Sequence, residues 1–310
     1  MKKTGFILLA FMLAALQGLS AQETYRYAQR DTCSLYLDIF RPTEGAVSRS
    51  GEVSKPTIVY LFGGGFIGGQ RKDDFTAKWF KLLNDNGFPV VTIDYRLGMK
   101  NYKVGKGLSG ALKAVDRFLL SQQVGVEDLF SAISYLDENK EKLGIDTGNI
   151  VFAGSSAGAI ITLAAVHAIA NGNTAGLPEG FKPKGAISFA GAIISTSGAP
   201  DFKDAPCPLL LFHGTADKAV AYKHYGIFGK GIWGSDFLAG RLSKKGYSHC
   251  IYRFKDRTHD VAAYHMVLWE LERQFLEECV IAGHAKTLDA FVDDASLPSW
   301  GSLSMGDIYK

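Results

Sequence analysis

Six apolar runs of strand length recur along this chain, and segments with helical periodicity separate them. The runs cover residues 57–62, 90–94, 149–153, 185–189, 208–213 and 250–254. Because they are apolar at nearly every position, they predict strands buried on both faces, which are typical of parallel sheets. The predicted helices between them cover residues 74–86, 107–122, 127–143, 157–170, 236–245 and 260–280. This alternation predicts an α/β fold with a mostly parallel central sheet and helices on both of its faces.

The first 21 residues have the features of an export signal. Lys2 and Lys3 precede an apolar run over residues 6–16 that is too short to span a membrane, and small residues suited to cleavage end at Ala21. A lipid anchor is the alternative, but no cysteine directly follows the apolar run. We therefore expect a cleaved signal peptide over residues 1–21 and a secreted or periplasmic mature protein.

The rest of the chain, residues 22–310, is expected to form a single domain, because α/β folds often use this length as one unit. An alternating segment at 35–40 predicts a strand at an antiparallel edge of the sheet. The core would extend from about residue 35 to residue 280. Weak periodicity predicts an irregular tail over residues 283–310.

Charge and cysteine spacing argue against several kinds of partner. Without Lys2 and Lys3 the formal net charge falls from +3 to +1, which gives no reason to expect nucleic acid or a membrane surface. Cysteines, histidines and acidic residues do not cluster at metal-ligand spacings, so neither a metal nor an organic cofactor is expected. Cys207 and Cys250 begin neighbouring predicted strands, and both a disulfide and free thiols remain open.

Residues 154–158, Gly-Ser-Ser-Ala-Gly, match the pattern G-x-S-x-G between a predicted strand and a predicted helix. In that setting the backbone turns so sharply that glycine is needed two residues either side of the serine, whose hydroxyl stands at a helix N-terminus. Ser156 is therefore the candidate nucleophile. A glycine-rich turn with a serine helix cap is the alternative. Ser155 lies one position off the motif, and we expect its hydroxyl to point elsewhere.

Residues 62–66, Phe-Gly-Gly-Gly-Phe, follow the first buried strand, and the glycines leave backbone N–H groups unshielded for an oxyanion. Here the chain resembles the esterase and lipase branch of the α/β-hydrolases, which has His-Gly-Gly-Gly-aromatic at this point. The resemblance implies an oxyanion hole made by the N–H groups of Gly64, Gly65 and Ala157. Phe62 replaces a histidine that braces the loop, so the departure concerns loop rigidity. A flexible glycine turn is the alternative.

The candidate acid and base follow the last two buried strands. Asp217 lies after the fifth apolar run, at the sheet edge where α/β proteins bind ligands, and His259 lies after the sixth. The order Ser156, Asp217, His259 is the one expected of this fold, with the histidine as general base and the aspartate orienting it. The less well placed rivals are Asp201, Asp204, Asp256, His167, His213, His224, His249, His265 and His284.

The resemblance spans about residues 35–280 and is closest to carboxylesterases that act on acetyl or feruloyl groups of plant polysaccharide. It includes Asp-Tyr-Arg-Leu at 94–97, where we expect Asp94 and Arg96 to form an ion pair that braces the oxyanion loop. The implied protein is a serine carboxylesterase that hydrolyses a small-molecule or polysaccharide-linked ester. Residues expected to contact the substrate are Phe66, Ser155, Tyr222 and Trp233.

Other functions fit the same scaffold. A serine peptidase or amidase would use the same three residues, because acyl-transfer chemistry does not separate esters from amides at this level. A lipase would differ in the length of the acyl chain it accepts. A non-catalytic binding protein could keep the fold, although the intact Ser156, Asp217 and His259 argue against it. Acyl and alcohol specificity and oligomeric state are not set by the sequence.

Overall fold

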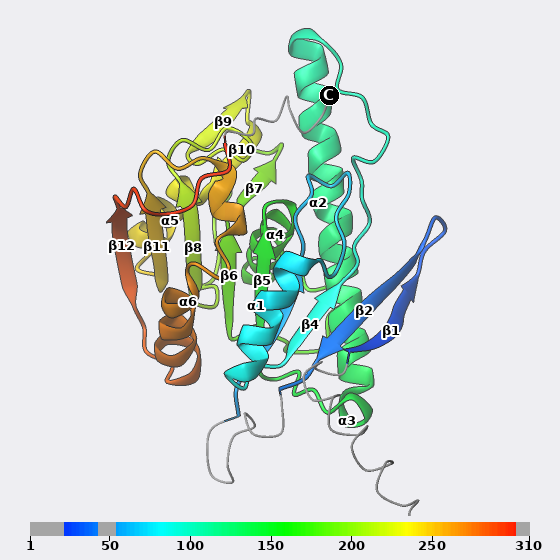
Figure 1. The fold of residues 1–310 in the computed structure, drawn as a ribbon. Coiled ribbons are helices and arrows are strands. Elements are labelled where there is room, and N and C mark those ends of the chain that lie inside the picture. Colours follow the sequence, from blue (N-terminus) through cyan, green and yellow to red (C-terminus); the bar gives the residue numbers. More distant parts are fainter. Residues whose placement is uncertain (1–21, 43–53, 302–310) are drawn as a thin grey trace, which may run out of the picture.

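A computed structural model describes residues 22–42 and 54–301 of this chain. The predicted signal peptide, residues 1–21, lies outside the described residues. The main sheet has nine strands in the order β1-β2-β4-β3-β5-β6-β8-β11-β12 (Figure 1). Its strands are β1 (Gln22–Gln29), β2 (Ser34–Phe40), β3 (Thr57–Leu61), β4 (Val90–Ile93), β5 (Ile150–Ser155), β6 (Gly185–Phe189), β8 (Leu209–Gly214), β11 (His249–Phe254) and β12 (Thr287–Val292).

Most neighbouring strands in this sheet are parallel, as predicted, and only the pairs β1–β2 and β2–β4 are antiparallel within the described residues. The segment 35–40 is antiparallel but is not the edge strand, because β1 covers its outer side. The prediction of an irregular tail is wrong over β12, which pairs in parallel with β11. Residues of β12 alternate between exposed and half-buried, so this edge strand lacks the continuous apolar signal of the central strands.

Helices cover both faces of the sheet. They are α1 (Asp74–Asp85), α2 (Gly107–Glu138), α3 (Lys140–Leu143), α4 (Ala157–Ala170), α5 (Ser235–Lys245) and α6 (Trp269–Phe275), with a 3₁₀ helix η1 (His259–Ala263) and a π-helical segment η2 (Leu276–Ile281). In Figure 1, α1 and α6 lie in front of the sheet and α2 and α4 lie behind it. The single helix predicted over 260–280 is wrong, because the buried Tyr264 and His265 interrupt it between η1 and α6.

One continuous helix, α2, replaces the two helices predicted over 107–122 and 127–143. Gly125 lies between those two segments, yet the helix continues through it. A Cβ atom at this position would come within 2.5 Å of the Ile161 side chain on α4. Gly125 therefore lets α2 pack closely on α4, and this contact offsets the roughly 1 kcal/mol that glycine costs inside a helix.

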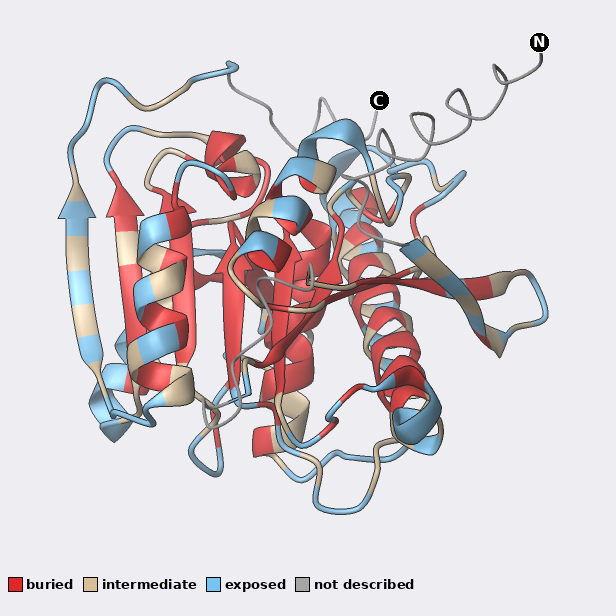
Figure 2. Cartoon of the chain, turned by 60° about the horizontal axis from the view of Figure 1, so that its bottom comes forward, coloured by how far each residue is buried: buried red, intermediate tan, exposed pale blue. Residues whose placement is uncertain are grey.

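The core lies on both faces of the central strands (Figure 2). Every residue of β3, β4, β5, β6 and β8 is buried. A fully buried Leu, Ile or Phe stabilises the fold by about 1.5–3 kcal/mol, which is why these strands are apolar at nearly every position. Helix α4 is apolar nearly all round because the sheet covers one side of it and α2 packs on another. None of the described helices combines the length and the apolarity that a membrane span requires.

A second, antiparallel sheet has the order β7-β10-β9 and was not predicted. Its strands are β7 (Ala192–Ser195), β9 (His224–Ile227) and β10 (Lys230–Gly234). In Figure 1, the β9–β10 hairpin and the first turns of α2 stand at the same end of the molecule, above the carboxyl ends of the parallel strands. These two elements therefore frame the edge of the sheet at which the candidate residues were expected.

Candidate active site

Ser156 lies at the sharp turn between β5 and α4. Its backbone has φ 51° and ψ −115°, a region that costs a non-glycine residue on the order of 1–3 kcal/mol. Two glycines make the turn possible. A Cβ atom at Gly154 would come within 2.4 Å of the backbone of Gly158, and one at Gly158 would come within 2.1 Å of the Leu61 carbonyl oxygen. The motif therefore has the strand–turn–helix geometry expected from the sequence.

Three polar side chains from three loops form one hydrogen-bonded line. His259 Nε2 lies 2.8 Å from Ser156 Oγ, and His259 Nδ1 lies 2.7 Å from Asp217 Oδ2. No member of the line is more than 9% exposed. In the resting state the serine O–H donates to Nε2, and the Nδ1–H donates to the carboxylate. The structure thus brings together the candidate nucleophile, base and acid.

Several donors surround the carboxylate of Asp217. Its Oδ1 accepts hydrogen bonds from the backbone N–H groups of Ala219, at 2.8 Å, and Val220, at 3.0 Å. Its Oδ2 lies 3.3 Å from Nε2 of His213. Burial favours the neutral acid, but the hydrogen bonds with His213 and His259 outweigh it and hold the pKa of Asp217 below its ordinary value. A charged Asp217 can orient the imidazole of His259 and stabilise its protonated form.

The glycine run after β3 lies directly against the nucleophile. A Cβ atom at Gly63 would meet Ser156 Cβ at 3.3 Å. Gly64 and Gly65 have φ values of 121° and 62°, which glycine adopts without the steric cost that other residues incur. This loop therefore approaches the serine closely through backbone atoms rather than through side chains.

Phe62, which stands where the resemblance expects a histidine, is fixed by Tyr95. The two rings stack with their centroids 4.4 Å apart, and the Tyr95 hydroxyl donates a 2.7 Å hydrogen bond to the carbonyl oxygen of Phe62. The loop is therefore braced by an aromatic pair. Tyr95 belongs to the Asp-Tyr-Arg-Leu motif. From that motif the sequence predicted that Asp94 and Arg96 brace the loop, whereas Tyr95 does so.

A cavity of about 20 Å³ opens beside Ser156. Gly65, Phe66 and Ala157 border it, so two of the predicted oxyanion-hole residues share one space with the nucleophile. Gly64 belongs to the same loop but does not line the cavity. Apolar side chains from α2, α4, the loop after β8 and the strands β7 and β10 complete the lining: Phe118, Ile160, Ile194, Ala219, Val220 and Ile232. Most of these residues come from distant parts of the chain and carry no local sequence signal.

Part of the sequence that forms this site matches a known protein family. The carboxylesterase family profile matches residues 14–196, more than half of the 310-residue chain. The chain belongs to the carboxylesterase family.

Curated relatives of this carboxylesterase-family chain align over limited stretches. A probable N-octanoylanthranilate hydrolase from Rhodococcus erythropolis is 32% identical over 107 residues, which cover 34% of this chain and 21% of that protein. Fumonisin B1 esterase from Sphingopyxis macrogoltabida is 28% identical over 138 residues, which cover 44% of this chain and 24% of that protein. The matched stretches thus span 21% and 24% of these two relatives.

A solved esterase extends the likeness over nearly the whole fold. The thermophilic esterase Est2 of Thermogutta terrifontis, with propionate bound, superposes with a TM-score of 0.57 at 22% identity. The alignment covers 84% of this chain and 96% of that one. The fold of this carboxylesterase-family member is therefore that of the α/β-hydrolases, as the sequence predicted.

Two residues expected to contact substrate lie elsewhere. The Ser155 hydroxyl donates a 2.6 Å hydrogen bond to the Ala262 carbonyl oxygen, inside the protein. Trp233 is buried against His224 and Phe237 and lines neither the small cavity nor the larger cleft above it. The Ser155 hydroxyl points elsewhere, as its place one position off the motif led us to expect, so its prediction as a substrate contact is wrong. The prediction for Trp233 is wrong as well, because the sequence could not tell the inward face of β10 from the outward one.

Tyr222 does line the larger cleft, whose volume is about 930 Å³. Its hydroxyl also hydrogen-bonds to the guanidinium of Arg253. His213, one of the less well placed rivals in the sequence, is fully buried and reaches the carboxylate of Asp217. Its position at the end of β8, four residues before Asp217, is the only local signal for that contact.

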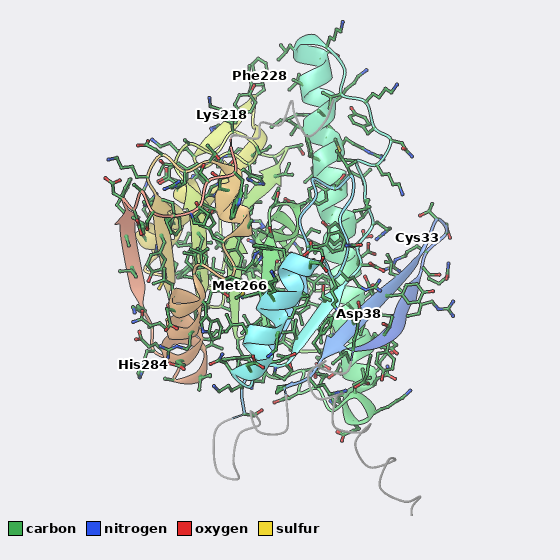
Figure 3. The ribbon with its side chains drawn as sticks, in the orientation of Figure 1. Cys33, Asp38, Lys218, Phe228, Met266 and His284 are labelled. Carbon is green, nitrogen blue, oxygen red and sulfur yellow. The ribbon has the colours of Figure 1, made fainter. Side chains whose placement is uncertain are left out.

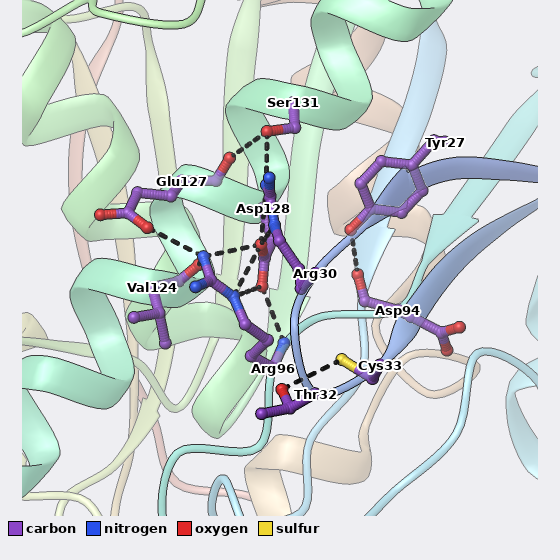
Figure 4. Close-up of polar contacts among 10 residues, drawn as sticks. All are labelled: Tyr27, Arg30, Thr32, Cys33, Asp94, Arg96, Val124, Glu127, Asp128 and Ser131. Carbon is purple, nitrogen blue, oxygen red and sulfur yellow. Dashed lines mark hydrogen bonds and ion pairs between the residues drawn. The ribbon is translucent and has the colours of Figure 1, made fainter.

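The ion pair expected between Asp94 and Arg96 is absent. Arg96 instead holds the buried carboxylate of Asp128 on α2, with Nε at 3.0 and 2.9 Å from its two oxygens (Figure 4). Arg30 reaches the same carboxylate at 3.1 Å, and Asp94 pairs with Arg71. A fully buried carboxylate needs charged partners, so Asp128 draws both arginines to it. This contact joins segments far apart in sequence, which local spacing cannot reveal.

All four cysteines, Cys33, Cys207, Cys250 and Cys279, are free thiols. Cys207, which is half-buried, and Cys250, which is buried, therefore do not form a disulfide with each other. Within the described residues, His, Cys, Asp and Glu side chains form no cluster of three or more suited to a metal ion.

Proposed function

We propose that this protein is a serine carboxylesterase in which Ser156 forms an acyl-enzyme. The observation that carries the proposal is the continuous line of hydrogen bonds from Ser156 through His259 to Asp217. Nucleophile, base and orienting acid within hydrogen-bond reach are the arrangement that covalent acyl transfer requires. Membership of the carboxylesterase family supports an ester as the substrate.

The reaction follows from these contacts. Ser156 Oγ attacks the ester carbonyl carbon while His259 Nε2 takes the serine proton. The tetrahedral intermediate collapses, the carbon–oxygen bond to the alcohol breaks, and the proton on Nε2 passes to the leaving alcohol. Water then attacks the acyl-serine through the same base and releases the carboxylic acid. Asp217, charged throughout, stabilises the imidazolium form of His259 in both halves.

The negative oxygen of each intermediate would be bound by backbone N–H groups of Gly64, Gly65 and Ala157. Support comes from the glycine loop lying against Ser156 and from the start of α4 at Ala157, where the helix dipole favours negative charge. Each such donor contributes on the order of 100-fold to 1000-fold to the rate in related chemistry.

The small cavity favours a short acyl group. Its volume of about 20 Å³ is close to the space that one water molecule needs, which suits an acetyl group far better than a feruloyl or fatty acyl group. Because Gly65, Phe66 and Ala157 line it beside Ser156, it suits the part of the substrate that remains on the serine. The solved Thermogutta terrifontis esterase carries propionate, which also supports a short acyl group.

Export completes the proposal. Residues 1–21 carry the positive start, apolar run and small-residue cleavage site of a signal peptide, and residues 22–310 would act as one exported domain. Acetyl esters of small molecules or of polysaccharides are substrates that such a protein would meet.

The test combines covalent labelling with a substrate panel. A fluorophosphonate probe should label the mature protein and fail to label Ser156→Ala. It should label Ser134→Ala normally, because Ser134 lies near the C-terminal end of α2 and does not line the small cavity. p-Nitrophenyl acetate should be hydrolysed faster than the butyrate, a long-chain ester, a feruloyl ester or a peptide amide. Labelling that persists in Ser156→Ala, or a preference for the amide or the long chain, contradicts the proposal.

A further inference from the structure

A second space opens directly above the small cavity. This cleft, of about 930 Å³, lies between the first turns of α2 and the β9–β10 hairpin. Its size falls in the range of small-molecule sites, about 300–1,000 Å³. It shares Phe118, Ala219 and Ile232 with the small cavity, and Asp217 also lines it. The two spaces therefore lie next to each other, on opposite sides of these shared side chains.

Much of the cleft's lining is apolar, and part of that apolar lining faces solvent. On the α2 side Val104, Leu108 and Val115 line it, and on the hairpin side Ile227 and Ile232 do so. Leu108 is 57% exposed and Ile227 is 44% exposed. Apolar side chains left in contact with water around a concave site mark it as a place where an apolar partner binds.

Three lysines lie beside this apolar surface. Lys218, Lys223 and Lys230 all line the cleft. Lys230 pairs with Asp116 at 2.6 Å, whereas no described acidic side chain pairs with Lys218 or Lys223. Figure 3 places Lys218 and Phe228 together at the hairpin end of the molecule. The cleft therefore combines an apolar interior with a positively charged rim.

We propose that this cleft binds the leaving alcohol of the ester, and that the alcohol it selects has an extended apolar body with an anionic group at its outer end. The inference rests on the esterase function proposed above. The acyl group must stay beside Ser156 until water arrives, whereas the alcohol must depart first, which suits the open cleft and not the closed cavity. An apolar body would cover Leu108 and Ile227, and the anion would lie near Lys218 and Lys223.

Three acetate esters test this with the mature full-length chain: phenyl acetate, 6-acetoxy-2-naphthamide and 6-acetoxy-2-naphthoate. Each kcat/KM is divided by the hydroxide-catalysed rate of the same ester, so that leaving-group reactivity cancels. We expect naphthamide over phenyl acetate to give a ratio of about tenfold from the additional buried ring. We expect naphthoate over naphthamide to give a further ratio of about threefold at low salt, falling toward one at high salt.

Variants assign these ratios to the two parts of the cleft. Leu108→Ser and Ile227→Ser should lower the naphthamide ratio toward one, whereas Phe291→Ser, an exposed apolar residue on β12, should not change it. The double variant Lys218→Ala/Lys223→Ala should lower the naphthoate ratio toward one, and the exposed Lys184→Ala should not. Ratios within one preparation do not depend on the fraction of protein that is folded.

The outcomes separate the two proposals. If Ser156-dependent hydrolysis of phenyl acetate is present and both ratios are near one, the esterase function stands and the cleft assignment is overturned. If Ser156→Ala hydrolyses phenyl acetate as fast as the parent protein, the esterase function fails and the inference fails with it. Binding to anionic phospholipid vesicles that Ile227→Ser abolishes, with a naphthoate ratio near one, would assign the cleft to a lipid surface and also overturn it.

Discussion

The Ser155 hydroxyl donates a 2.6 Å hydrogen bond to the carbonyl oxygen of Ala262, and this bond ties the strand end beside the proposed nucleophile to the turn that carries the proposed base. Ser155 is the last residue of β5, directly before Ser156, and Ala262 lies in η1, which begins at His259. Both partners are buried, so water does not compete for the bond. The distance between Ser156 and His259 therefore depends on a residue that does not touch the substrate.

Replacing Ser155 by alanine should lower kcat about tenfold or more with little change in KM, because small misplacements of a catalytic pair reduce the rate steeply. Steady-state kinetics with p-nitrophenyl acetate measure this. Ser188→Ala is the matched control, since Ser188 is a buried serine on the next strand whose hydroxyl has no partner among the described residues. Equal kcat values for the two variants would show that the bond to Ala262 does not position His259.

Asp217→Asn should lower kcat by about 10³-fold to 10⁴-fold, because an amide cannot hold the imidazole in the required tautomer or stabilise its charged form. The same kinetics measure it, over a range of pH values. Asp201→Asn serves as control, because Asp201 is a rival acid in sequence but pairs at the surface with Lys245. If the Asp217→Asn variant keeps most of the kcat of the parent protein, another group orients His259.

Ile160→Ala should enlarge the small cavity and raise the butyryl-to-acetyl ratio of kcat/KM by about tenfold, since one or two methylenes contribute this much discrimination in an apolar pocket. Ile161→Ala is its control: it removes the same atoms from the adjacent helix position but faces Gly125 of α2 instead of the cavity. Both variants should be destabilised by about 2–5 kcal/mol. An equal ratio in the two would argue that the acyl group binds elsewhere.

Glu272 gives a pH-dependent prediction for stability. Burial raises its pKa well above the ordinary value, and the hydrogen bond from Trp79 opposes this only in part. The folded state therefore binds a proton that the unfolded state loses near the ordinary pKa of 4.5, so the free energy of unfolding falls as pH rises above that value. Glu272→Gln cannot ionise, and its stability advantage over the parent should increase with pH by at most about 1.4 kcal/mol per unit.

Denaturant unfolding above about pH 7 is the suitable measurement, because there the second buried group, His265, does not change its protonation on unfolding. Burial lowers the pKa of His265 to about 3, so its proton uptake on unfolding destabilises the fold only below its ordinary pKa of 6.5. A constant difference between Glu272→Gln and the parent across the alkaline range would mean that Glu272 is already ionised in the folded protein.

The parts of the fold that local chemistry determines were predictable. Strands such as Val90–Ile93 are buried on both faces and are therefore apolar at nearly every position, and the Gly154 and Gly158 pair permits one sharp turn. The order of Ser156, Asp217 and His259 along the chain then follows from the fold.

Contacts between distant segments were not predictable. Whether Gly125 breaks a helix or packs against one depends on Ile161, thirty-six positions away. The choice of Asp128 as the partner of Arg96, and the inward turn of Ser155, likewise depend on elements that only the folded chain brings together. The half-exposed β12 lacks a signal because edge strands need not be apolar.

The uninterrupted course of α2 restricts how the substrate site of such a protein can change. Helix α2 carries both Phe118, which lines the small cavity with Ser156, and Asp128, which Arg96 holds. No loop lies between these two residues to absorb a change in length. Deleting one residue between them would turn one end against the other by about 100° and shift it about 1.5 Å, carrying Phe118 away from Ser156. New specificities can therefore arise on this wall by substitution alone, whereas the facing hairpin turn can also lengthen or shorten.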